Sequence, residues 1–96
     1  MYVKIHPSGE KEVVAICDEV LIGKKLTQGE LELNISESFY KGDKKSVEEV
    51  KEIMLASKNL NLVGEETIAL AINLKILDKE NIIEVCGVEH AQLFSN

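Results

Sequence analysis

The 96-residue chain contains no arginine and no tryptophan, and it has a single proline. All 11 basic residues are lysine, so the chain lacks the guanidinium fork that reads guanine edges and holds phosphates through paired hydrogen bonds. Its formal net charge of -6 repels nucleic-acid backbones and anionic lipid surfaces. The sequence therefore predicts no sequence-specific DNA binding, although A+T-rich codon usage is an alternative reason for the missing arginine.

Signatures of metal and nucleotide sites are missing as well. The cysteines, Cys17 and Cys86, have no CxxC spacing, and the histidines, His6 and His90, belong to no HxxxH or HExxH motif. The six glycines form neither GxGxxG nor a phosphate-binding loop. We therefore predict no cofactor and no metal site, with His6 on the solvent face of an edge strand.

Long apolar runs and a cleavable signal are also absent. No run approaches the ~18 residues that a membrane span needs, and residue 1 leads directly into a strand pattern. We expect a cytoplasmic protein in a reducing compartment, with both thiols free and buried as small apolar side chains. A hydrophobic content of 45% in a chain of this length predicts one domain, residues 1–96, with a mainly aliphatic core.

Hydrophobic periodicity predicts three strands in the first part of the chain. Residues 1–6 alternate between apolar and polar, and residues 12–17 form a nearly continuous apolar run that is typical of a central strand. A turn over Pro7-Ser8-Gly9-Glu10 joins them into a hairpin. Residues 18–22 favour a short helical turn, and strict alternation over 30–36 predicts a third strand.

The rest of the chain is predicted to be mainly helical. A capping box at Ser46 starts an amphipathic helix over 46–58, and after a break at 59–64 a second helix covers 65–77. An apolar run over 82–86 predicts a fourth strand before the tail. The predicted fold is α+β: a two-layer sandwich of three or four mostly antiparallel strands with two main helices on one face.

Cys17 is the candidate with the most chemical character, because it ends a strand beside a predicted helical turn. One hypothesis makes it the nucleophile of a small thiol-dependent enzyme, with His90 as its base. The two carboxylates that follow, Asp18 and Glu19, raise a thiol's pKa, and packing is the more common role of a free cysteine. We therefore favour a structural role for Cys17.

Two surface features suggest binding. Phe39 and Tyr40 form an aromatic pair in a polar loop. Exposed aromatic rings are costly unless they pack against the core or bind a partner. We favour packing for Phe39 and keep both packing and binding as alternatives for Tyr40. A local patch of Lys41, Lys44 and Lys45 is the one segment that suggests RNA.

Four segments of the chain resemble the small archaeal family catalogued as domain of unknown function 424. They are Cys17-Asp18-Glu19 with Gly23-Lys24, Glu37-Ser38-Phe39-Tyr40 with Gly42, Asn61-Leu62-Val63-Gly64-Glu65, and Gly87-Val88 with His90-Ala91-Gln92. The resemblance covers nearly the whole chain and departs from the family at Glu89, where proline is common. It implies a two-layer α+β fold and an archaeal cytoplasmic protein without an established activity.

The polar residues of these motifs that packing does not obviously require are the candidate binding residues. They are Lys24, Glu37, Tyr40, Asn61, Glu65, His90 and Gln92, and Asp18 is a further polar residue of the same motifs. Because they lack catalytic spacing, we favour a non-enzymatic binding or adaptor domain, serving translation or another RNA process, with a protein as partner. A homodimer through an open edge strand, 1–6 or 30–36, is a further hypothesis.

Overall fold

The computed structural model describes residues 1–94. Its strands and helices, in chain order, are β1 (Tyr2–Ser8), β2 (Lys11–Cys17), a 3-10 turn (Glu19–Leu21), β3 (Lys25–Gln28), β4 (Leu31–Asn34), α1 (Glu37–Tyr40), β5 (Asp43–Lys44), α2 (Val47–Ala56), β6 (Leu60–Val63), α3 (Glu65–Asn73), a 3-10 turn (Lys79–Asn81), β7 (Ile83–Val85) and β8 (Val88–Leu93).

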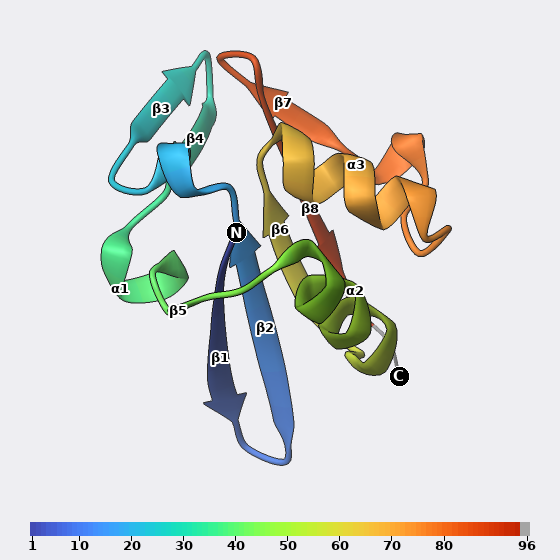
Figure 1. Cartoon of the computed structure of the whole chain (residues 1–96). Helices are drawn as coiled ribbons and strands as arrows, with labels where there is room; N and C mark the ends of the chain where they lie inside the picture. Colours follow the sequence, from blue (N-terminus) through green and yellow to red (C-terminus); the bar gives the residue numbers. More distant parts are fainter. Residues whose placement is uncertain (95–96) are drawn as a thin grey trace.

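These strands form two sheets. The larger has six strands in the order β5-β1-β2-β6-β8-β7, and the smaller is the β3–β4 hairpin (Figure 1). Strands β2 and β6 run parallel, whereas the other neighbours run antiparallel, so the larger sheet is mixed. The class is α+β, but the predicted sheet of three or four mostly antiparallel strands was wrong.

Both faces of the larger sheet are covered. Helices α2 and α3 lie on one face, where Met54 and Ile68 pack with Ile16 and Leu62 (Figure 1). On the other face the β3–β4 hairpin and α1 lie over a second cluster that includes Cys17. The predicted two-layer sandwich was therefore wrong, because a hairpin adds cover on the side that was expected to be open.

Besides the two-residue β5, two strands of the larger sheet were not predicted. Residues 59–64 were expected to break a helical pair, yet Leu60–Val63 is the buried strand β6 between β2 and β8. Residues after 87 were expected to form a tail, yet Val88–Leu93 is β8. Residues 60–63 are too short, and residues 88–93 have no apolar run or alternation, so periodicity does not separate either strand from a loop.

Three further features differ from the predictions. The strand expected over 30–36 exists as β4, but it pairs with β3 outside the main sheet. The helix expected over 65–77 ends at Asn73. Cys86, expected buried in a strand, is exposed and occupies a turn with φ 51°, so that prediction was wrong.

The start of α2 agrees with its sequence signature. The Ser46 hydroxyl accepts a hydrogen bond from the Glu49 backbone N–H at 3.2 Å, and the Glu49 carboxylate accepts one from Ser46 N–H at 3.1 Å. This confirms the predicted capping box. None of the helices within residues 1–94 has the length and apolar character required to cross a bilayer.

Candidate functional site

Asn61 is a polar side chain in the middle of the buried strand β6, and it faces away from α2 and α3. Only 9% of its surface is exposed. The Tyr40 hydroxyl, on α1, donates a hydrogen bond of 2.6 Å to Asn61 Oδ1. Burial raises the pKa of Tyr40 to about 12, so the phenol stays neutral and keeps its proton for this bond. The amide nitrogen of Asn61 is then oriented as a donor.

Gln92 and His90 lie beside Asn61 on the same face of the sheet. Gln92 is the residue directly opposite Asn61 in the antiparallel β6–β8 pair, and His90 is opposite Val63. Residues opposite each other in such a pair project from one face, so the Gln92 amide and the Asn61 amide are neighbours. Gln92 is exposed, which makes it the member of this cluster most accessible to a ligand.

The ring of His90 is half-buried and neutral. Its Nδ1 donates to the Leu62 carbonyl at 3.0 Å, which leaves Nε2 as a hydrogen-bond acceptor. Burial lowers the pKa of His90, against a smaller opposing effect of that hydrogen bond. Tyr40, Asn61, His90 and Gln92 therefore form a cluster without a formal charge at neutral pH, which we call the polar cluster.

Helix α1, which carries Tyr40, is held on the sheet by two side chains of β1. Lys4 Nζ donates to the Ser38 carbonyl at 2.6 Å, and His6 Nε2 donates to the Phe39 carbonyl at 2.7 Å. The His6 and Phe39 rings stack with centroids 4.3 Å apart. The prediction that His6 lies on a solvent face was wrong, and the roles of Lys4 and His6 were missed, although alternation placed both on one side of the strand.

Three predicted binding residues lie outside the polar cluster. Lys24 is exposed at the start of the β3–β4 hairpin, where its carbonyl accepts from Ile35 N–H at 2.8 Å. Glu37 is exposed at the first position of α1, and Glu65 is exposed at the first position of α3. No hydrogen bond or ion pair between side chains connects these three to the cluster within residues 1–94.

Two of the lysines proposed for RNA binding form ion pairs with the protein itself. Lys44 Nζ lies 3.2 Å from a Glu19 carboxylate oxygen, and Lys45 Nζ lies 3.9 Å from Glu49. Lys41 is exposed after α1. The nearby carboxylates reduce the positive field that a phosphate backbone would need.

Asp18 has a structural role that accounts for its place in the motif. Its carboxylate caps α3 by accepting hydrogen bonds from Glu66 N–H and Thr67 N–H, both at 2.9 Å, and from the Thr67 hydroxyl at 2.7 Å. Gly64 makes this approach possible, because a Cβ there would lie 2.3 Å from Asp18 Cγ. Two motif segments that are far apart in sequence thus serve one helix start.

A family model described as "Protein of unknown function (DUF424)" matches residues 6–95. The chain belongs to this family. Among solved structures, this DUF424 protein is similar to an uncharacterized conserved protein from Methanopyrus kandleri, with 27% identity and a TM-score of 0.76. The similarity covers 99% of this chain and 93% of the other. A comparison with curated proteins finds no match.

The thiol of Cys17 in this DUF424 protein does not meet the requirements of a nucleophile. Its side chain is fully buried, and Sγ donates to the Asp18 carbonyl at 3.2 Å. Burial, with a further contribution from the Asp18 charge, raises the pKa of Cys17 to about 12. His90 lies two strands away through Val63, a backbone separation of roughly 10 Å. The geometry therefore gives no support to a Cys17–His90 pair.

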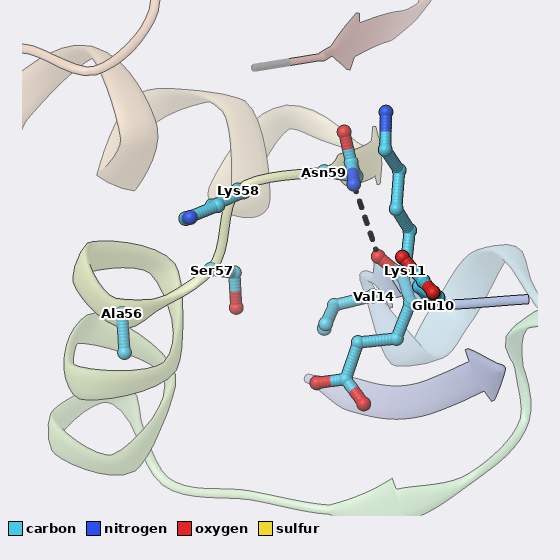
Figure 2. A pocket seen from close by; sticks show the side chains of 8 residues that line it. Glu10, Lys11, Val14, Ala56, Ser57, Lys58 and Asn59 are labelled. Atoms are coloured by element: carbon cyan, nitrogen blue, oxygen red, sulfur yellow. Dashed lines mark hydrogen bonds between the residues drawn. The ribbon is translucent and has the colours of Figure 1, made fainter. Parts of the chain in front are cut away.

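A cavity of about 310 Å³ lies where the C-terminal end of α2 meets the start of β2 (Figure 2). Ser57, Lys58 and Asn59 line one side of it, and Glu10 and Lys11 line the other. The Asn59 amide donates to the Glu12 carbonyl at 3.3 Å and so joins the two sides. None of the predicted binding residues lines this cavity, and its charged side chains are exposed.

Within residues 1–94 of this DUF424 protein, no group of three or more histidine, cysteine or acidic side chains is placed to hold a metal ion. The polar cluster combines an amide donor on Asn61, a two-sided amide on Gln92 and an acceptor nitrogen on His90. Such neutral groups recognise a ligand by hydrogen bonds rather than by charge.

Proposed function

We propose that this protein is a binding domain that acts in the cytoplasm, and that its partner is another protein. The proposed contact surface is the polar cluster of Tyr40, Asn61, His90 and Gln92. The observation that supports it is the convergence of these side chains, from α1, β6 and β8, on one face of the sheet. The buried hydrogen bond from the Tyr40 hydroxyl also fixes the position of the Asn61 amide for a ligand.

Electrostatics favour a protein over RNA as the partner. The cluster is neutral, two of the three nearby lysines are paired with glutamates, and the net charge of the chain is -6. RNA recognition gains most of its affinity from cations against phosphates, which these groups do not supply. Peptide groups and uncharged side chains match donors and acceptors of the kind found on Asn61 and Gln92.

Quantitative affinity capture tests the proposal. The tagged protein, a His90→Ala, Gln92→Ala variant and a Glu65→Gln control would each be incubated with archaeal extract, with and without nuclease treatment, and retained proteins compared by mass spectrometry. We expect a protein retained by the wild type and by the control, and lost by the double variant. Retention that is equal for all three, or that disappears on nuclease treatment, would contradict the proposal.

A further inference from the structure

The two edges of the six-stranded sheet differ in their protection. On one edge, β5 pairs with β1 only at Tyr2 and Val3, and the open remainder of β1 contains Pro7. Proline cannot donate a backbone hydrogen bond, and it is a common device that blocks strand pairing at an edge. On the other edge, β7 covers β8 only up to His90.

Beyond His90, the described part of β8 has one open backbone N–H and C=O, those of Gln92. The Glu89 carbonyl accepts from Gly64 N–H at 2.9 Å, so Glu89 faces the β6 side of the strand. Alternate residues of a strand face opposite neighbours, and Ala91 and Leu93 therefore also face β6. Gln92 faces the other way, past the end of β7, where its N–H and C=O meet no strand of residues 1–94.

Residues 91–94 have none of the usual protections of an edge. The segment Ala91-Gln92-Leu93-Phe94 has no charge and no proline. Phe94 is 71% exposed and Leu55, on α2, is 62% exposed. Between them lies a groove of about 360 Å³ whose lining combines apolar side chains, including Leu60, Ile76 and Leu93, with Ser57 and Lys58. Exposed apolar side chains beside an open strand are typical of a strand-binding surface.

Pairing with a second copy of the chain is restricted by register. In a symmetric antiparallel pair centred on Gln92, Phe94 of one copy would lie opposite His90 of the other. That position is already occupied by Ile83 of β7. The shared ladder could extend only over 91–93, whereas a separate peptide has no β7 of its own and could pair along the whole of 91–94.

From this geometry we propose that the open edge of β8 binds an extended segment of a partner protein as an added strand. This inference rests on the proposed binding function and names its mode. Side chains opposite Leu93 would be apolar and enter the groove beside Leu55. Side chains opposite Gln92 would project on the face of the polar cluster and be polar, because residues opposite each other share a face. The predicted partner segment thus alternates between apolar and polar residues.

A phage library of random dodecapeptides provides the probe. Peptides enriched on the wild-type protein would be synthesised, and their Kd measured for the wild type, for Gln92→Pro and for Gln92→Ala. We expect alternating sequences and binding about tenfold or more weaker for Gln92→Pro than for Gln92→Ala, because both variants lose the amide side chain and only proline also removes the edge N–H. The Gln92 N–H makes no bond to β6, so we expect Gln92→Pro to retain its circular dichroism spectrum. Hydrogen exchange at the Gln92 amide should be fast without peptide and slow with it.

The controls separate this inference from the proposed function. Equal weakening by Gln92→Pro and Gln92→Ala would assign the loss to the Gln92 side chain alone, which would overturn strand addition and leave the polar cluster as the contact surface. Equal Kd for all three proteins would contradict both. Failure to enrich any peptide over the Gln92→Pro protein would overturn strand addition. If Gln92→Pro does not fold, peptides methylated at successive backbone nitrogens replace it, and equal Kd along that series would overturn the inference.

Discussion

Replacing Asp18 by alanine removes the carboxylate that accepts all three hydrogen bonds at the start of α3. Loss of a helix cap costs about 0.5–2 kcal/mol. Thr67 is fully buried and keeps a backbone N–H and a hydroxyl that lose their partner, at a cost of about 1–3 kcal/mol for each buried unpaired group. Because such costs overlap, we expect the free energy of unfolding to fall by about 3–5 kcal/mol in Asp18→Ala.

Urea unfolding followed by circular dichroism at 222 nm measures this change, since the chain has no tryptophan. Asp18→Asn keeps the size and one acceptor oxygen, and we expect a loss of about 1–2 kcal/mol. Glu65→Gln alters an exposed carboxylate at the same helix end and should change stability by about 0.5 kcal/mol. If Asp18→Ala unfolds within about 1 kcal/mol of the wild type, the capping argument is wrong.

Three further predictions concern Gly64, the cysteines and His90. Gly64→Ala should lower the unfolding free energy by about 2 kcal/mol or more, measured by the same urea assay, because Gly64 has φ 110° and a Cβ there meets Asp18. Iodoacetamide at pH 8 should label Cys86 and leave Cys17 unmodified in the native protein, as mass spectrometry would show; rapid labelling of Cys17 would contradict its burial. The pKa of His90 is lower in the folded than in the unfolded state. The contribution of the neutral ring to stability is therefore complete above pH 6.5 and decreases as pH falls below that value. His90→Gln should flatten the pH dependence of the unfolding free energy between pH 7 and 5.

The elements that the sequence predicted correctly have strong local signals. The apolar run at 12–17 is the buried strand β2, and the capping box at Ser46 starts α2. Each signal comes from residues close together in the chain, where side-chain spacing and hydrogen bonding determine one local structure. The position of β6 between β2 and β8 has no such signal, since parallel pairing with β2 depends on contacts across 46 residues, as in Val14 with Leu60.

The polar cluster also depends on contacts between segments that are distant in the sequence. Asn61, His90 and Gln92 are polar residues in separate motif segments. The two strands that align them, β6 and β8, were predicted to be a loop and a tail. Their convergence therefore could not be derived from spacing along the chain. Asp18 belongs to the same motif and serves packing instead, because its carboxylate is fully used by α3.

The distinction between these roles rests on the hydrogen-bonding capacity that each side chain keeps. Both carboxylate oxygens of Asp18 accept hydrogen bonds from α3. These bonds stabilise its charge, so the residue can be buried with only 6% of its surface exposed. Asn61 uses one oxygen for Tyr40, and its amide nitrogen lies next to the exposed Gln92 amide at the open end of β8. A polar group in a central strand is costly unless its bonds are satisfied. Gln92, the residue opposite Asn61, lies at the one edge of the main sheet that lacks protection among the described residues. That placement joins the polar cluster to the β8 edge as a single surface for a partner strand.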